Sequence, residues 1–114
     1  MGVIKDRFKA KADEANIEIK ALLKEHGSKK IGEVTLSQIY QGMRGITGLV
    51  SETSLLDPQE GIRFRGYTIP ELQQKLPKAQ GGNEPLPEGL FYLMLMGELP
   101  TVSDVNEVTD QLQR

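Results

Sequence analysis

The residues of this sequence best suited to binding chemistry are an arginine set among glycines: Gly42, Arg44, Gly45 and Gly48. Glycines let backbone N–H groups approach an anion closely, and a guanidinium adds a charge-assisted hydrogen bond to a phosphate. The spacing matches neither the dinucleotide-binding glycine pattern nor the P-loop. Two interpretations therefore remain open: a phosphate-binding loop around Arg44, or tight turns that allow close packing, and the residues alone favour the turns.

The other candidate residues are the single histidine, His26, and a pair of arginines, Arg63 and Arg65. An imidazole suits general base catalysis, but His26 has no evident partner and ends a predicted helix, where a cation is stabilising. The two arginines share one side of a predicted strand. They are expected to form salt bridges with nearby carboxylates: Glu52, Asp57 or Glu60. No metal-binding, Walker or nucleophile-elbow pattern occurs, so the sequence assigns no catalytic residue and no metal ligand.

Hydrophobic periodicity predicts a mainly α-helical chain with a small β region. Apolar residues three and four apart predict an amphipathic helix from about Ile4 to Glu25, ended by His26 and by Gly27 in a left-handed cap. Thr68 and Glu71 form a capping-box pattern at the start of a second helix, over 68–77. The remaining predictions are helices over 85–97 and 101–114, a strand over 30–36, and two or three short strands between 45 and 66.

Composition excludes several classes of protein. With 38% apolar and 26% charged residues and a net charge of -2, the chain has no basic stripe for nucleic acid. No apolar run is long enough to span a bilayer, and no cysteine is present for disulfides or thiolate chemistry. The first residues have neither a secretory nor a transit-peptide pattern. We therefore expect neither nucleic-acid binding nor membrane insertion.

The apolar helix over 85–97 offers an independent expectation about domain organisation. Because it is apolar nearly all round, it needs cover on several sides, yet the chain supplies few elements to cover it. The last predicted helix still runs at Arg114. Both features lead us to expect an incomplete domain of a longer protein.

Six runs of residues form a distinctive succession: Gly42–Gly45, Glu52–Pro58, Glu60–Gly66, Ile69–Glu71, Glu84–Phe91 and Gly97–Thr101. In order and spacing these runs resemble eukaryotic-type citrate synthases, most closely the mitochondrial type. The resemblance covers nearly the whole chain and is weakest over residues 1–20.

The resemblance implies an almost wholly helical fold with a large and a small domain, working as a homodimer in the mitochondrial matrix. Residues 1–114 would be the amino-terminal, incomplete part of the large domain. The implied reaction condenses acetyl-CoA with oxaloacetate and water to give citrate and CoA, without a permanently bound cofactor. The family's catalytic and oxaloacetate-binding residues lie downstream, so this segment alone is not expected to be active. Arg44 matches the family's arginine that contacts a phosphate of CoA.

Two alternatives from other classes remain. A truncated, non-catalytic relative of citrate synthase would act as a structural or interaction module, and its apolar helix would then need a partner chain. A small domain that binds only the phosphates of CoA would depend on Arg44. Citrate formation, binding to a different protein, or retention on immobilised CoA would separate the three hypotheses.

Overall fold

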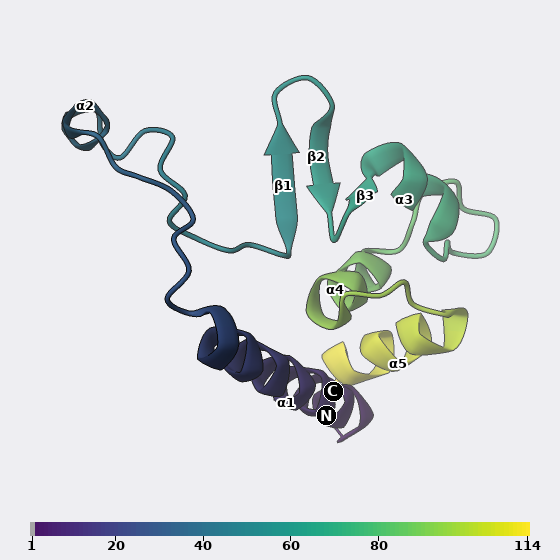
Figure 1. Ribbon diagram of the computed structural model, residues 1–114. Coiled ribbons are helices and arrows are strands. Elements are labelled where there is room, and N and C mark those ends of the chain that lie inside the picture. The colour runs from purple at the N-terminus through teal and green to yellow at the C-terminus, as the bar shows by residue number, and fades with distance from the viewer. Residues whose placement is uncertain (1) are drawn as a thin grey trace. The chain divides into compact units, whose positions relative to one another are not determined.

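The computed structural model describes residues 2–114 and is mainly α-helical with one small sheet, which confirms the predicted fold class (Figure 1). The helices in these residues are α1 (Gly2–His26), α2 (Leu36–Tyr40), α3 (Ile69–Lys75), α4 (Pro87–Met96) and α5 (Val102–Leu112). The strands are β1 (Ser54–Asp57), β2 (Gly61–Phe64) and β3 (Tyr67–Thr68), which pair antiparallel in chain order. The chain divides into two units, one formed by the residues up to Asp13 with Ser51–Arg114, the other by Glu14–Val50.

Helix α4 is the centre of the first unit. Leu93 is 0% exposed and packs with Leu72 and Leu76 of the α3 region, while Tyr92 and Met96 belong to a second apolar cluster. Burying a leucine side chain fully contributes about 1.5–3 kcal/mol. The unit therefore buries α4 on two sides with its own residues, more than the sequence led us to expect.

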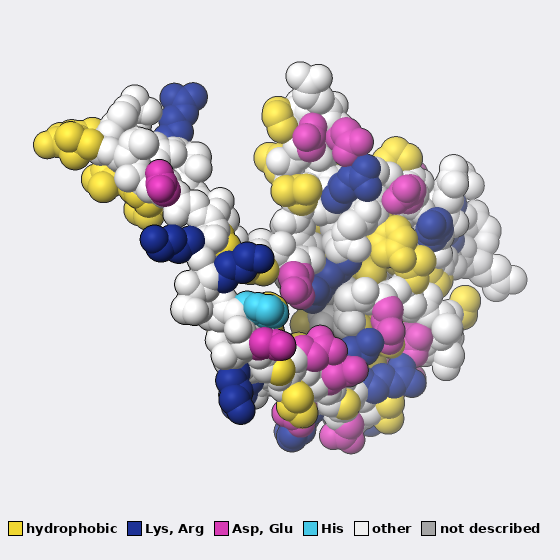
Figure 2. Space-filling model, in the orientation of Figure 1, with side chains coloured by type: hydrophobic (Ala, Val, Ile, Leu, Met, Phe, Trp, Pro, Cys, Tyr) yellow, Lys and Arg dark blue, Asp and Glu magenta, His cyan; other side chains and the backbone are white. Residues whose placement is uncertain are grey.

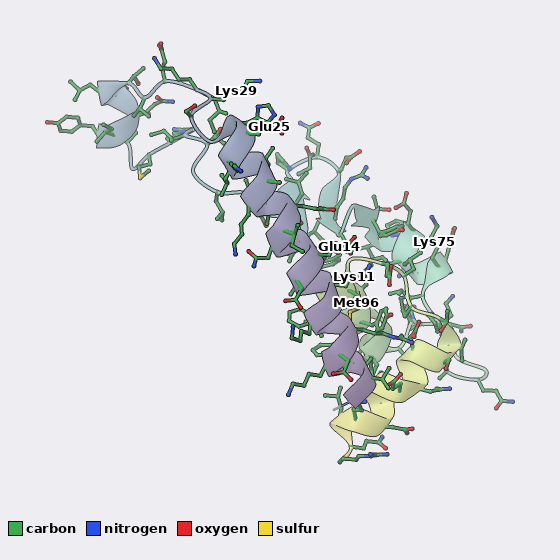
Figure 3. The ribbon with its side chains drawn as sticks, turned by 60° about the horizontal axis from the view of Figure 1, so that its bottom comes forward. Lys11, Glu14, Glu25, Lys29, Lys75 and Met96 are labelled. Carbon is green, nitrogen blue, oxygen red and sulfur yellow. The ribbon has the colours of Figure 1, made fainter. Side chains whose placement is uncertain are left out.

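The second apolar cluster joins α4 to α5 and to the beginning of α1. Ile4 packs there with Tyr92, Met96 and Val108. Close to this cluster, Lys11 forms an ion pair with Glu98 at 3.0 Å, so the first half of α1 lies against the end of α4 (Figure 3). The first half of α1 is therefore held by the buried side chain of Ile4 and by the ion pair between Lys11 and Glu98.

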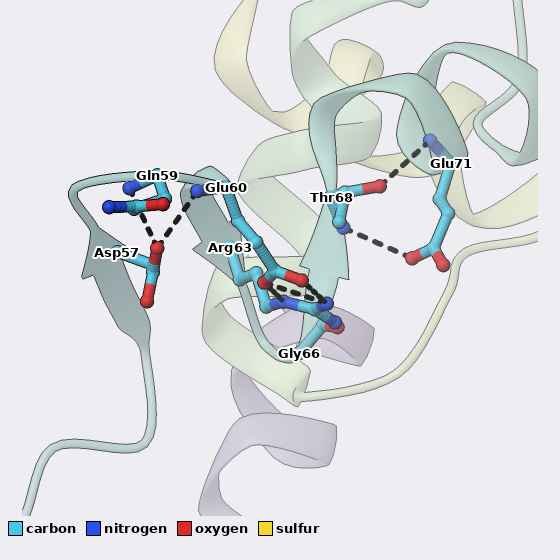
Figure 4. A network of polar contacts seen from close by, with 7 residues as sticks. All are labelled: Asp57, Gln59, Glu60, Arg63, Gly66, Thr68 and Glu71. Atoms are coloured by element: carbon cyan, nitrogen blue, oxygen red, sulfur yellow. Dashed lines mark hydrogen bonds and ion pairs between the residues drawn. The ribbon is translucent and has the colours of Figure 1, made fainter.

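Helix α3 begins as the sequence predicts, directly after the small sheet. The β1–β2 hairpin pairs Leu55 with Arg63, and its loop places Asp57 Oδ1 2.8 Å from the backbone nitrogens of Gln59 and Glu60 (Figure 4). Thr68 caps α3 in a capping box with Glu71, as predicted from their spacing. These local hydrogen bonds depend on residue type and spacing alone, which is why the sequence reveals them.

The second unit differs because it has no hydrophobic core of its own. None of its residues is buried, and only Gln38 and Ile46 are half-buried. Hydrophobic side chains of α2 lie open at the surface, including Leu36 at 71% and Tyr40 at 85% exposure (Figure 2). Local hydrogen bonds therefore determine the conformation of α2 and the loop after it.

Four expectations about local structure are wrong. Residues 31–35 form no strand, because Thr35 caps α2 instead. Gly27 is not in a left-handed conformation; it is needed because a Cβ there would lie 2.3 Å from the backbone oxygen of Leu23. The β region begins at Ser54 rather than near residue 45. Helix α5 ends at Leu112, so it is not still running at Arg114.

Candidate functional site

The loop that follows α2 carries the candidate phosphate ligand Arg44. The Gly42 N–H donates to the carbonyl of Ile39 at 3.2 Å, and the Met43 N–H donates to the carbonyl of Gln38 at 2.8 Å. Gly42 has a φ of 74°, the left-handed conformation that glycine adopts without steric cost. Together these features form a Schellman motif, which ends a helix by satisfying its last carbonyl groups.

A second turn, named the arginine turn here, spans Met43 to Ile46 and places Arg44 at a corner of the chain. The Ile46 N–H donates to the carbonyl of Met43 at 3.2 Å, so Arg44 and Gly45 are the two central residues. Gly45 has a φ of 72°, as the third position of a type II turn requires. The first residue of the turn, Met43, also has a positive φ, of 61°, which is uncommon for a residue with a side chain. The Arg44 backbone is thus set by hydrogen bonds on both sides.

The beginning of α2 is closed by a capping box that sequence reasoning missed. The side chain of Thr35 accepts the Gln38 N–H at 3.2 Å, and the side chain of Gln38 accepts the Thr35 N–H at 2.9 Å. A threonine followed three residues later by glutamine is a recognisable signal for this motif. The signal was overlooked because the alternating apolar residues of 30–36 favoured a strand.

The arrangement leaves Arg44 available to bind an anion. Arg44 is exposed, and among residues 2–114 its guanidinium takes part in no ion pair. A guanidinium in this position can donate two parallel hydrogen bonds to a phosphate. Gly42 and Gly45 thus form the tight turns that one interpretation predicted, and phosphate binding by Arg44 stays a prediction.

The two arginines of the hairpin have different roles. Arg63 pairs with Glu60 at 3.0 Å and also donates to the backbone carbonyl of Gly66, as Figure 4 shows. Arg65 lies beyond β2 with a φ of 49°, and its Nε and Nη2 donate to the carbonyl of Met94 at 3.0 and 2.6 Å. The expected salt bridge is therefore confirmed for Arg63 and wrong for Arg65, whose partner is the last turn of α4.

Two aspartates have pKa values below the usual range, for structural reasons. Backbone N–H groups of Glu60 and then Gln59 hydrogen-bond the Asp57 carboxylate and lower its pKa. At Asp104, desolvation acts in the opposite direction, but hydrogen bonds from Thr101 and from Arg7 prevail and lower the pKa. Arg7 also contacts the Tyr92 hydroxyl at 3.3 Å. Both lowered pKa values therefore reflect hydrogen bonds that stabilise the folded structure.

Other chemistry-bearing features of residues 2–114 do not form a site. His26 is exposed, with its Nε2 3.8 Å from the carboxylate of Glu25. In the described part of the chain no group of three His, Asp or Glu side chains could hold a metal ion, and no helix is long and apolar enough to cross a membrane. A hollow of about 470 Å³ beside α4 is almost wholly apolar, so it suits side chains rather than a phosphate. It is lined by Pro87, Glu88, Leu90, Phe91, Met94 and Leu112.

Comparisons with known proteins agree with this fold and place the chain in a family. Residues 42–114 match the family model described as "Citrate synthase, C-terminal domain". That range begins at Gly42, one residue before the turn that carries Arg44, and includes the hairpin and helices α3 to α5. The chain belongs to the citrate synthase family.

Three curated relatives of this chain are all named as mitochondrial proteins. The chain is 57% identical to "Citrate synthase, mitochondrial" of Saccharomyces cerevisiae, over 96% of this chain and 23% of that protein. It is 58% identical to the mitochondrial citrate synthase of Aspergillus niger, over 93% of this chain and 22% of that protein. It is 61% identical to "2-methylcitrate synthase, mitochondrial" of Yarrowia lipolytica, over 90% of this chain and 22% of that protein. The chain thus spans less than a quarter of the length of these curated relatives.

Proposed function

We propose that this chain is the amino-terminal part of the large domain of a citrate synthase. The parent enzyme condenses acetyl-CoA with oxaloacetate and water, and releases citrate and CoA. It works as a homodimer in the mitochondrial matrix and holds no permanent cofactor. Within residues 1–114 the proposal assigns no catalytic residue and no metal ligand. The family match over residues 42–114, with identities near 60% to mitochondrial relatives, carries the assignment to citrate synthase; the amino-terminal position rests on the resemblance of the sequence.

Within that function, we assign Arg44 the role of contacting a phosphate of CoA. Its support is local: the exposed guanidinium stands at the corner of a turn closed by hydrogen bonds on either side. An arginine–phosphate contact removes little conformational freedom when the arginine's backbone is already ordered. The role concerns binding, because a contact made equally in the ground state and the transition state changes KM and leaves kcat unchanged.

The test is steady-state kinetics of the intact natural protein that carries this segment. Arg44→Ala should raise KM for acetyl-CoA by roughly 10- to 100-fold, the range for a lost charged hydrogen bond, with kcat unchanged. The matched control is Arg63→Ala, because Arg63 already pairs with Glu60. An unchanged KM in Arg44→Ala would contradict the assigned role. Absence of any citrate formation by the unmodified protein would instead favour the non-catalytic relative.

A second candidate reaction is 2-methylcitrate synthesis, because one relative with 61% identity carries that name. Its product has one more methyl group than citrate, so its acyl donor would be propionyl-CoA. The two donors share the same CoA, so a contact to phosphate would not discriminate between them. Comparing kcat/KM for acetyl-CoA and propionyl-CoA decides between the two reactions.

A further inference from the structure

Both ends of helix α2 are closed through one residue, Gln38. At the first end, its side-chain oxygen accepts the backbone N–H of Thr35 at 2.9 Å and the Thr35 hydroxyl at 3.3 Å. At the other end, its backbone carbonyl accepts the Met43 N–H at 2.8 Å. Among the described residues, only Gln38 takes part both in the capping box at the start of α2 and in the Schellman motif at its end. The capping box and the Schellman motif therefore share a residue.

Gln38 also lies beside the arginine turn. A Cβ built on Gly45 would stand 3.8 Å from the side-chain nitrogen of Gln38, which is the nearest atom to that position. Gln38 is half-buried, as is Ile46 at the end of the same turn, whereas every other residue of Glu14–Val50 is exposed. The side chain of Gln38 thus lies next to Gly45, in the loop that carries Arg44.

Helix α2 has five residues, too few to be stable by itself, because forming the first helical turn costs more than its hydrogen bonds return. Within Glu14–Val50 no residue is buried, so in this unit α2 is held by the hydrogen bonds at its two ends. When α2 opens, the carbonyl of Gln38 no longer holds Met43, and the turn around Arg44 loses its anchor.

We propose that Gln38 is a positioning residue, which keeps the arginine turn in the geometry that binds a CoA phosphate. This inference rests on the proposed role of Arg44. Gln38 does not touch the phosphate; its side chain closes the first end of α2, and the formed helix holds its backbone carbonyl where it accepts the Met43 N–H. Its effect on substrate binding should therefore exist only while Arg44 is present.

The experiment measures KM for acetyl-CoA in the intact natural protein, with Gln38→Ala made in the native and in the Arg44→Ala background. Loss of a helix cap corresponds to about a fivefold rise in KM in the native background, with kcat unchanged. In the Arg44→Ala background the same change should have no further effect. The matched control is Leu36→Ala, which changes an exposed apolar residue of the same helix and removes no side-chain hydrogen bond.

A second pair of variants tests the capping box without altering Gln38. Thr35→Ala should raise KM as Gln38→Ala does, and Thr35→Ser should restore the native value because serine supplies the same hydroxyl. This pair also decides the question if Gln38→Ala reduces expression or lowers the melting temperature of the protein.

The outcomes separate this inference from the proposed function. If Arg44→Ala raises KM but Gln38→Ala has the same effect with and without Arg44, the glutamine has only a structural role and the inference is wrong. The same conclusion follows if Thr35→Ala leaves KM unchanged. If Arg44→Ala itself leaves KM unchanged, the phosphate role of Arg44 is wrong, and the positioning role is refuted with it.

Discussion

Replacing Arg65 tests whether its contact with α4 or its place in the hairpin determines its contribution to stability. Arg65 donates two hydrogen bonds, at 3.0 and 2.6 Å, to the carbonyl of Met94, which belongs to the last turn of α4. A cation near the C-terminus of a helix also interacts favourably with the negative end of the helix dipole. A hydrogen bond from a charged group contributes about 1.5–3 kcal/mol, so Arg65→Ala should destabilise this turn by about that amount.

The assay is amide hydrogen exchange of the intact protein, read in peptides that cover residues 94–98. A loss of about 1.5–3 kcal/mol corresponds to roughly 10- to 150-fold faster exchange through local opening. Arg63→Ala is the matched control, because the Arg63–Glu60 pair is partly exposed and such pairs contribute about 0–1 kcal/mol. Its effect on the same peptides should stay below about fivefold.

A third variant separates the side chain of Arg65 from its backbone. Arg65 has a φ of 49°, a conformation that costs a residue with a side chain about 1 kcal/mol and costs glycine nothing. Arg65→Gly should therefore be less destabilising than Arg65→Ala by about 1 kcal/mol, although both lose the guanidinium. Equal exchange rates in Arg65→Ala and Arg63→Ala would refute the reasoning, since the bonds to Met94 would then contribute nothing.

Three further predictions concern the first unit. Leu93→Ala removes a side chain that is 0% exposed and should cost about 2–5 kcal/mol in thermal unfolding, whereas Leu55→Ala, at 65% exposure, should change stability by less than about 0.5 kcal/mol; equal effects would contradict the core assignment. Because the pKa of Asp57 is lowered in the folded protein, its contribution to stability is present above the unfolded pKa and is lost as pH falls through the folded value. Asp57→Asn should thus reduce the loss of unfolding free energy as the pH falls below the ordinary range of an aspartate pKa, and an unchanged acid limb would count against the assigned hydrogen bonds. Gly97 ends α4 with a φ of 75°, so Gly97→Ala should lower the melting temperature, with Gly32→Ala, in open space, as a neutral control.

Local motifs are the part of the fold that sequence reasoning predicted best. The capping box of Thr68 and Glu71 was predicted because it depends on residues three positions apart, whereas the left-handed cap was predicted at Gly27 and is found at Gly97, at the end of α4. The same logic applied to Thr35 and Gln38 would have found α2. It was overruled by a short alternation of apolar residues, which is a weak signal when no partner strand is known.

The candidate site was predicted in part. The glycines and Arg44 could be selected from the sequence, because their residue types suit both tight turns and phosphate binding. The hydrogen bonds that orient the turn could not, since they require α2 to end where it does. The phosphate role of Arg44 stays a prediction until KM is measured.

What the sequence determined by itself is the family, the mainly α-helical class and the start of α3, because these follow from residue identity and short spacing. What only the tertiary structure decided is the partner of each side chain. Arg63 and Arg65 are two positions apart, yet one pairs with a carboxylate three residues away and the other with a carbonyl twenty-nine residues away. That difference arises because β2 ends at Phe64 and Arg65 adopts a positive φ, which turns its side chain from the hairpin towards α4. Contacts between distant residues depend on such backbone geometry, which spacing along the chain does not encode.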